Sequence, residues 1–147
     1  MPAAAIPAAV LVLIVHGPQP GILLTKRTST LAKHAGQVAF PGGRIDPEDP
    51  SIEAAALREA YEEVGLPPEQ PEVLGRLPDY LTGTGFRISP VLALLPSPVM
   101  LTPNPNEVEA IFTLPLDVLL DPAAPQRQRA EFRGRMREFW VWPHTEH

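Results

Sequence analysis

The chain has 147 residues, the usual size of a single domain, so an enzyme built from two domains around a cleft is disfavoured. Hydrophobic residues make up 44% and charged residues 20%, which excludes disordered, collagen-like and coiled-coil chains. The 12 basic and 17 acidic residues give a net charge of -5 without a Lys/Arg run, so no nucleic-acid partner is expected. The absence of Cys excludes disulfides and thiolate metal sites and fits a reducing, cytoplasmic location.

The apolar start of the chain is predicted to be a strand rather than a targeting segment. Ala8–Val15 carries β-branched residues at alternate positions, and Gly17-Pro18 ends it. No Lys or Arg precedes this run, and it is too short to span a bilayer. We therefore expect no signal peptide and no membrane partner. The 20 prolines, about 14% of the chain against roughly 5% in average proteins, predict many short elements.

The next segments alternate between strands and loops. Residues 22–27 form a predicted strand that is antiparallel to the first, because residues 18–21 make a short turn. Residues 28–35 are expected to be a loop and residues 37–40 a third strand. At Pro41–Gly43 two glycines allow backbone angles that are closed to other residues, so a sharp turn is predicted there.

One long helix is predicted from Pro50 to Val64, after a polar loop at residues 44–48. Asp49 followed by Pro50 is typical of a helix start, with Asp as the N-cap and Pro at the first helical position. Gly65 is the predicted C-terminal stop, and the two prolines that follow prevent continuation.

The second half of the chain is predicted to hold mostly strands. The expected strands are 72–77, 87–95, 107–113 and 137–142, and a short helix is expected at 114–120. Strand groups on both sides of one long helix indicate a single α+β domain over residues 1–147, with helix and sheet in α/β/α layers.

The long helix is predicted to gather carboxylates on one side. At 100° per residue, Glu59, Glu62 and Glu63 fall within an arc of roughly 100°. The opposite side is expected to face the core and holds Ala54, Leu57, Ala60, Tyr61 and Val64. Glu59 and Glu63 repel one another by about 0.2 to 0.5 kcal/mol, so the cluster is unfavourable unless a cation neutralises it.

Two neighbouring features favour a metal site over the alternative of a merely solvated acidic face. Ala55 and Ala56, expected on or beside the carboxylate side, are too small to block a ligand, and Arg58 is spaced to hold Glu62 in place. Carboxylates with few other ligands suit a hard ion such as Mg²⁺ or Mn²⁺, which accepts phosphate oxygens.

The segment from Gly43 to Leu66 resembles the Nudix box, Gly-x5-Glu-x7-Arg-Glu-hydrophobic-x-Glu-Glu-x-Gly-hydrophobic. Asp49 fills the first acidic position, and eight residues rather than seven separate it from Arg58. The resemblance implies an α/β/α sandwich with a mixed sheet and a hydrolase that cleaves a diphosphate linkage in a nucleoside diphosphate derivative. It also implies that Glu59, Glu62 and Glu63 hold Mg²⁺ or Mn²⁺.

A second pattern, upstream, is similar to the signature of the coenzyme A pyrophosphatase branch of that family. Residues Leu23–Thr28 and Gly36–Gly43 match nine of its eleven specified positions, and the departures are Thr28 and Ala32. This resemblance implies hydrolysis of coenzyme A or its thioesters to 3',5'-ADP and a 4'-phosphopantetheine product. Other substrates left open are ADP-ribose and NADH, and a non-catalytic nucleotide-binding module is the alternative from another class.

Several further residues are candidates for the site. Strand alternation directs only one of Lys26 and Arg27 to a given face, and the coenzyme A signature favours Arg27. The substrate phosphates are expected to bind Arg27, Gly42, Gly43 and His34. The alternatives are a solvated charge at the strand end for Arg27 and an exposed loop histidine for His34. Glu107 or Glu109 is expected to act as general base or extra metal ligand, with a surface acid as the alternative. Four aromatic residues are expected in the core, with stacking on adenine as the alternative: Phe86, Phe139, Trp140 and Trp142.

The end of the chain departs from the pattern that the resemblance implies. A helix is expected to close the domain, yet the sequence stops at His147, a few residues after Trp142. Two explanations stay open: this sequence omits a tail, or the sheet face is covered otherwise, for example by the second subunit of a homodimer, because an uncovered apolar face would favour association.

Overall fold

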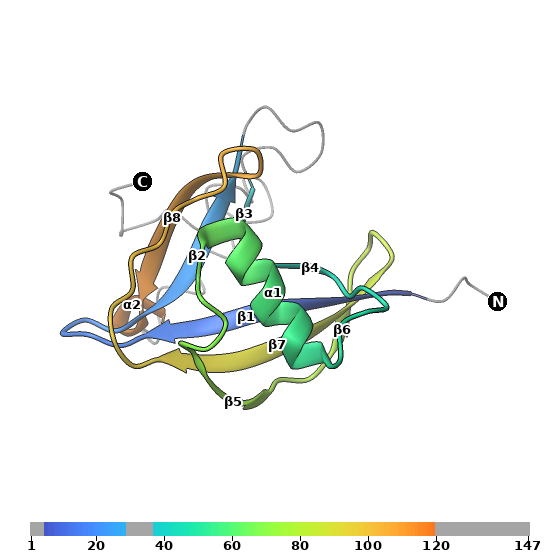
Figure 1. Ribbon diagram of the computed structural model, residues 1–147, viewed down its shortest axis with the longest axis horizontal. Helices are drawn as coiled ribbons and strands as arrows, with labels where there is room; N and C mark the ends of the chain where they lie inside the picture. Colours follow the sequence, from blue (N-terminus) through green and yellow to red (C-terminus); the bar gives the residue numbers. More distant parts are fainter. Residues whose placement is uncertain (1–4, 29–36, 120–147) are drawn as a thin grey trace.

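Eight strands of the chain form one mixed sheet, and a 13-residue helix packs against it (Figure 1). This computed structural model describes residues 5–28 and 37–119. The elements are β1 (Ile6–Val15), β2 (Gly21–Arg27), β3 (Val38–Ala39), β4 (Gly42–Arg44), α1 (Ile52–Val64), β5 (Glu72–Arg76), β6 (Tyr80–Leu81), β7 (Phe86–Leu95), β8 (Val108–Pro115) and α2 (Leu116–Leu119). The α+β class with a mixed sheet is confirmed.

The centre of the sheet is the parallel pair β1 and β7. They are in register over their whole length, from Ile6 opposite Phe86 to Val15 opposite Leu95. The predicted antiparallel pairing of β1 with β2 is confirmed, and β2 pairs in turn with β3 and β8. On the other side, β7 pairs with β5 and β6. The sheet order β3-β2-β1-β7-β5 therefore places the apolar N-terminal strand in the middle.

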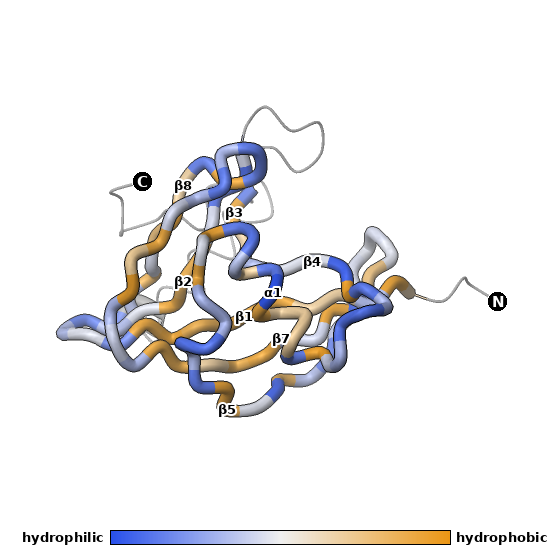
Figure 2. Tube along the Cα trace, viewed as in Figure 1, coloured by the Kyte–Doolittle hydropathy of each residue, from blue (hydrophilic) through white to orange (hydrophobic). Residues whose placement is uncertain are grey.

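Alternate side chains of the central strands belong to two separate apolar clusters, one on each face of the sheet. Leu11 and Leu13 of β1 pack in the cluster beneath α1, together with Val91 and Ala93 of β7. Val12 points to the other face, where a second cluster forms between β2 and β8 around residues that include Ile22, Leu24, Phe112 and Leu114. The hydropathy colouring shows the apolar central strands, β1 and β7, running beneath the helix (Figure 2). The sheet is thus buried on both faces at its centre.

Strand β4 differs from the prediction of a sharp turn followed by a polar loop. Gly42, Gly43 and Arg44 are extended and pair antiparallel with Val10, Ala9 and Ala8 of β1. Neither glycine has a positive φ. They are needed for space instead: a Cβ on Gly42 would clash with the Ala9 carbonyl oxygen. Close approach of two backbones, rather than an unusual turn, is therefore the physical reason for this pair of glycines.

Helix α1 starts two residues later than predicted, while its predicted stop is confirmed. Ser51, and not Asp49, is the N-cap: its side chain accepts a hydrogen bond from the Ala54 backbone N–H at 3.0 Å. Gly65 adopts the left-handed conformation with φ 73°, and its N–H donates to the Tyr61 carbonyl at 2.9 Å. The Asp49 side chain does not cap the helix and instead accepts two hydrogen bonds from Arg58.

The predicted division of α1 is confirmed for Ala60 and Val64, which are buried in the core, and is wrong at other positions. Ala55 and Ala56 are fully buried in the core, and Glu63 is buried beside them, whereas Tyr61 is exposed. The physical reason is the size of the alanines, which lets the helix lie close to β1 and β4. Part of the carboxylate cluster is therefore directed into the protein.

Other boundaries follow the prediction with small shifts. Strand β8 extends to Pro115, so the predicted helix at 114–120 is reduced to α2 within the described residues. The two-residue strand β6 was not predicted, because it is too short to show a pattern. The predicted strand at 137–142 lies outside the described residues. Among the described residues, no helix is long and apolar enough to cross a membrane.

Candidate active site

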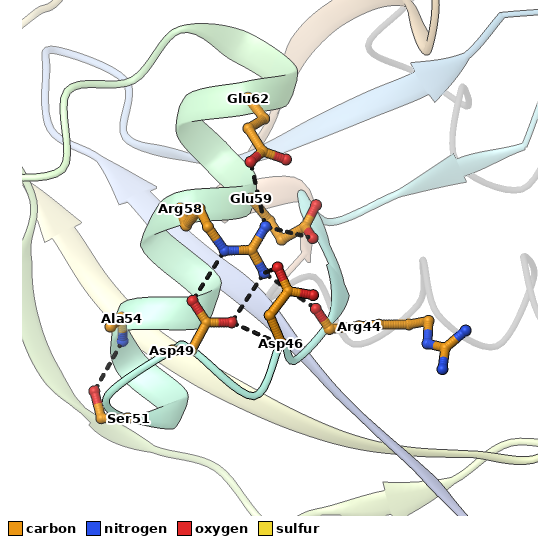
Figure 3. A network of polar contacts seen from close by, with 8 residues as sticks. All are labelled: Arg44, Asp46, Asp49, Ser51, Ala54, Arg58, Glu59 and Glu62. Atoms are coloured by element: carbon orange, nitrogen blue, oxygen red, sulfur yellow. Dashed lines mark hydrogen bonds and ion pairs between the residues drawn. The ribbon is translucent and has the colours of Figure 1, made fainter.

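Arg58 is the centre of a polar network at the start of α1 (Figure 3). Its Nε and Nη2 donate to the two carboxylate oxygens of Asp49 at 2.9 and 3.0 Å. Its Nη1 donates to Glu59 at 3.2 Å and to Glu62 at 3.3 Å, which is the contact with Glu62 that the spacing predicts. A fifth bond, from Nη2 to the Arg44 carbonyl at 3.2 Å, connects the network to β4. One guanidinium thus fixes two of the candidate metal ligands.

The charges in this network stabilise one another. The hydrogen bond from Arg58 lowers the pKa of Asp49, and the same bond raises the pKa of Arg58. Asp46 adds an ion pair to Arg58 at 3.5 Å, and its backbone N–H donates to Asp49 at 2.7 Å. Sequence reasoning missed these roles of Asp46 and Asp49, because both sit in a loop whose shape has no sequence pattern.

The three glutamates of α1 lie in very different surroundings. The Glu62 side chain is 51% exposed, the Glu59 side chain is 15% exposed, and Glu63 is 5% exposed. Burial raises the pKa of Glu59. Burial, together with the negative charges of Glu59 and Glu107, raises the pKa of Glu63 to about 8. The positive charges of Arg58, near Glu59, and of Arg27, near Glu63, lower these pKa values but do not offset the effect of burial.

Gly43 makes room for one of these carboxylates. A Cβ on Gly43 would lie 2.6 Å from the Glu59 carboxylate, so any side chain there would displace it. A backbone hydrogen bond from Gly42 opposes the rise in the pKa of Glu63. The two glycines therefore bring the backbone of β4 next to the glutamates, where we predict that they contact substrate.

Arg27 lies beside the same carboxylates. Its positive charge also opposes the rise in the pKa of Glu63. Its Nε is buried, and no described residue accepts a hydrogen bond from it. Lys26 instead pairs with Glu109 at the surface, at 3.8 Å, and a register shift in the pairing of β2 with β8 separates it from Arg27. Lys26 and Arg27 thus lie in different surroundings, Lys26 beside the surface acid Glu109 and Arg27 at the cavity described next.

Arg27 and Glu63 both line a cavity of about 240 Å³ at the point where β1 and β2 diverge. Strands β1 and β2 pair only near Ile14 and Val15. Nearer the start of β1, at residues 8–10, β1 pairs with β4 instead. The rest of the lining is mostly apolar and includes Phe40, Phe86 and Ile88. Phe86 thus lines the cavity rather than the core, and this position is the one that stacking on adenine, the alternative prediction for Phe86, would need.

Glu107 is carried by the loop between β7 and β8, which is bonded to the end of α1. The backbone N–H of Asn104 donates to the Glu63 carbonyl at 2.9 Å, and the Glu107 N–H donates to the Asn104 carbonyl at 3.0 Å. Its charge contributes to the raised pKa of both Glu59 and Glu63, so it lies near them. The role of Asn104 has no sequence signal, because it acts through its backbone. His34, Phe139, Trp140 and Trp142 lie outside the described residues.

The comparisons with known proteins place the chain in a family. The family model of the NUDIX domain matches residues 5–141. The "Uncharacterized Nudix hydrolase NudL" of Cronobacter sakazakii is 54% identical over 134 residues, which are 91% of this chain and 70% of that protein. The chain belongs to the Nudix hydrolase family. It spans 57% to 70% of the length of the first curated relatives that it matches.

Solved structures agree with this assignment. A Nudix hydrolase from M. smegmatis, RenU, has a TM-score of 0.66 and 27% identity, and covers 89% of this chain and 88% of its own. The NUDIX domain of Shewanella oneidensis NrtR, crystallised with ADP ribose, has a TM-score of 0.60 and 26% identity, and covers 89% of each chain. The chain is thus an enzyme of this class, which hydrolyses nucleoside diphosphate derivatives.

Nudix hydrolases generally use divalent metal ions, and the donor chemistry of this site fits one. Burial raises the pKa of Glu59 and of Glu63, and a bound cation would favour the charged forms of both carboxyls. Among the described residues, no three acidic or histidine side chains already meet closely enough to share an ion. Glu59 and Glu62 each accept a hydrogen bond from Arg58 through one carboxylate oxygen, so their other oxygens are left for a cation while Arg58 holds both side chains.

Proposed function

We propose that this enzyme hydrolyses the diphosphate linkage of coenzyme A or its thioesters, giving 3',5'-ADP and (acyl-)4'-phosphopantetheine. The observation that carries the proposal is the half-buried Arg27, which lines the cavity together with Glu63 and Gly42 and whose Nε is buried without an acceptor among the described residues. A buried guanidinium N–H without an acceptor is unfavourable, and a phosphate oxygen supplies that acceptor. The coenzyme A signature from Leu23 to Gly43 runs through Arg27 and the two glycines of β4.

Each group in the site has a defined task in this reaction. Glu59, Glu62 and Glu63 would hold Mg²⁺ or Mn²⁺, which stabilises negative charge on the phosphate oxygens. Arg27 binds a phosphate of the substrate, and the apolar walls around Phe40 and Phe86 accept the rest of the molecule. A water attacks one phosphorus, the P–O bond of the anhydride breaks, and the other phosphate leaves.

Glu107 is our candidate for the general base. It lies near Glu59 and Glu63, and its loop is bonded to the C-terminal end of α1, so its position follows that of the catalytic helix. A carboxylate in this place takes the proton of the attacking water. Arg58 is a positioning residue, because it acts through Glu59 and Glu62.

A second substrate class is favoured by one comparison. The NUDIX domain of NrtR was crystallised with ADP ribose, and it is 26% identical to this chain. ADP-ribose and NADH carry the same diphosphate between two groups, so the site described here also accommodates their reacting centre.

A substrate panel separates the two classes. Coenzyme A, ADP-ribose and NADH are incubated with the enzyme in Mg²⁺ and in Mn²⁺, and kcat/KM and product masses are measured. The proposal predicts the highest kcat/KM for coenzyme A, with 3',5'-ADP as a product. A tenfold preference for ADP-ribose would leave the diphosphate chemistry in place and contradict the coenzyme A assignment.

A further inference from the structure

The cavity carries a second arginine, Arg44, whose side chain has no task in the reaction above. Arg44 is the last residue of β4 and is exposed. Its backbone carbonyl accepts a hydrogen bond from Arg58, while its side chain extends away from Arg58 and the carboxylates (Figure 3). No bond joins its guanidinium to another residue in the described part of the chain. The backbone of Arg44 is fixed, and its charge is available to a ligand.

The strand register places Arg44 on one particular wall of the cavity. Arg44 is opposite Ala8 of β1, and Ala8 is opposite Ile88 of β7. Residues paired in this way project from the same side of a sheet, and both Ala8 and Ile88 line the cavity. Phe86, two residues before Ile88 on the same strand, lines it as well. Arg44 therefore stands beside an apolar and aromatic wall.

Arg27 belongs to the opposite wall. It lines the cavity together with Thr25 of β2 and Ala39 of β3, which pair with each other. The cavity is thus lined by the half-buried Arg27, next to Glu63, and by the exposed Arg44, on the side of Phe86. A diphosphate bound at Arg27 leaves Arg44 for another anionic group. A ligand that contacts both Arg27 and Arg44 therefore carries two separate anionic groups. The part of the ligand between these groups is apolar or planar, because the cavity between the two arginines is mostly apolar.

We propose that Arg44 binds a phosphomonoester on the ribose of the substrate and so selects nucleotides that carry this group in addition to the diphosphate. The inference rests on the proposed function, because coenzyme A has such a group, the 3'-phosphate, whereas ADP-ribose and NADH do not. Arginine suits this contact, since its planar guanidinium donates two parallel hydrogen bonds to a phosphate. Phe86 on the same wall offers an apolar surface to the adenosine that carries the group.

The test measures binding without turnover. Adenosine 3',5'-bisphosphate and AMP, which differ only in the ribose phosphate, are titrated calorimetrically into wild type, Arg44→Gln and Arg87→Gln. Arg87 is the matched control, an exposed arginine on β7 that does not line the cavity. We expect wild type and Arg87→Gln to bind the bisphosphate at least tenfold more tightly than AMP. In Arg44→Gln this preference falls to twofold or less, with the affinity for AMP unchanged.

Equal binding of the two nucleotides by wild type, or a preference that survives in Arg44→Gln, overturns the assignment of Arg44. Turnover of coenzyme A by wild type, measured alongside, tests the proposed function separately. If coenzyme A is cleaved while the preference is absent, the function stands and the Arg44 contact is wrong. If the preference depends on Arg44 while coenzyme A is not cleaved, the contact stands and the coenzyme A function is wrong.

Discussion

Arg58 shows how single residues hold this site together, because its five N–H groups reach three acidic side chains and a backbone carbonyl. The Nudix box places an acidic residue upstream of this arginine, and here Asp49 fills that place with one extra residue of spacing. The bidentate bond between Asp49 and Arg58 shows that the loop absorbs the extra residue. The variation from the family pattern therefore leaves the network intact.

Replacement of Asp49 tests this network. Asp49→Asn removes a charged acceptor that is only 7% exposed, so we expect a loss of about 1.5 to 3 kcal/mol in the free energy of unfolding. We also expect a fall in kcat of at least tenfold with little change in KM, because Arg58 no longer holds Glu59 and Glu62. Urea unfolding and steady-state kinetics measure both. Asp46→Asn is the control: its side chain is 52% exposed, and we expect a loss below about 1 kcal/mol. Equal effects of the two substitutions would contradict the role of Asp49.

Arg27 makes a separate prediction at the same scale. Arg27→Lys keeps the charge but loses the planar fork, so a lost charge-assisted bond of about 1.5 to 3 kcal/mol lowers kcat/KM for coenzyme A roughly tenfold to hundredfold. Lys26→Gln, at a cation that pairs with Glu109 on the surface, serves as the control and leaves kcat/KM unchanged. Unchanged kinetics in both Arg27→Lys and Arg27→Ala would remove Arg27 from the site.

At the scale of elements, the decisive feature is the packing of α1 against β4. The helix presents alanines to the sheet, and the strand presents glycines to the helix, so Glu59 reaches the backbone of β4. Gly43→Ala is expected to displace the Glu59 carboxylate and to lower turnover at least tenfold, with little loss of stability because the displaced atoms are the far end of a flexible side chain.

The control for this prediction is Gly17→Ala. Nothing lies within 4 Å of a Cβ on Gly17, so neither turnover nor stability should fall. Kinetics and urea unfolding of the two variants provide the comparison. If Gly43→Ala behaves like Gly17→Ala, the close approach of β4 to Glu59 has no functional importance.

The sequence predicts those elements whose cause is local. The apolar run of β1, the antiparallel connection to β2 and the Gly65 stop of α1 each follow from a few neighbouring residues, and all three are confirmed. The predicted N-cap, Asp49, was wrong because Asp49 and Ser51 are both good capping residues. Arg58, which is distant from Asp49 in sequence, binds the Asp49 carboxylate, and Ser51 caps the helix. Strand β4 was missed because its pairing with β1 depends on a contact across the chain.

The site residues likewise divide into those whose position has a local cause and those whose position depends on distant parts of the chain. The Arg58–Glu62 contact is local and was predicted correctly, whereas the burial of Glu63 depends on the sheet beneath the helix. The cavity between β1 and β2 exists because β4 separates the two strands, and no local pattern indicates it. The roles of Arg27, Gly42, Gly43 and Glu107 stay predictions, now with a shared location.

At the scale of the whole molecule, the buried carboxyls make stability depend on pH and on cations. The pKa of Glu63 is raised from 4.5 to about 8, so its neutral form is favoured in the folded state. Below pH 4.5 this contribution to stability is fully present. It is lost as pH rises towards 8, because the unfolded chain ionises first, and the loss amounts to at most about 5 kcal/mol. The raised pKa of Glu59 acts in the same direction.

Urea unfolding of the metal-free enzyme between pH 5 and pH 8.5 measures this dependence. We expect the stability of wild type to fall across that range, and Glu63→Gln, which cannot ionise, to show a flatter profile. Added Mg²⁺ binds the ionised carboxylates and is expected to reverse the fall in wild type only. Identical pH profiles for wild type and Glu63→Gln would contradict the raised pKa of Glu63.

The central claim is that the carboxylates of α1 carry metal-dependent diphosphate hydrolysis, and turnover as a function of Mg²⁺ concentration tests it most directly. Wild type, Glu63→Gln and the control Glu69→Gln, an exposed acid beyond the end of α1, are compared with coenzyme A as substrate. We predict that Glu63→Gln lowers turnover by orders of magnitude at every Mg²⁺ concentration, while Glu69→Gln matches wild type. Near-normal, Mg²⁺-dependent turnover in Glu63→Gln would contradict the account.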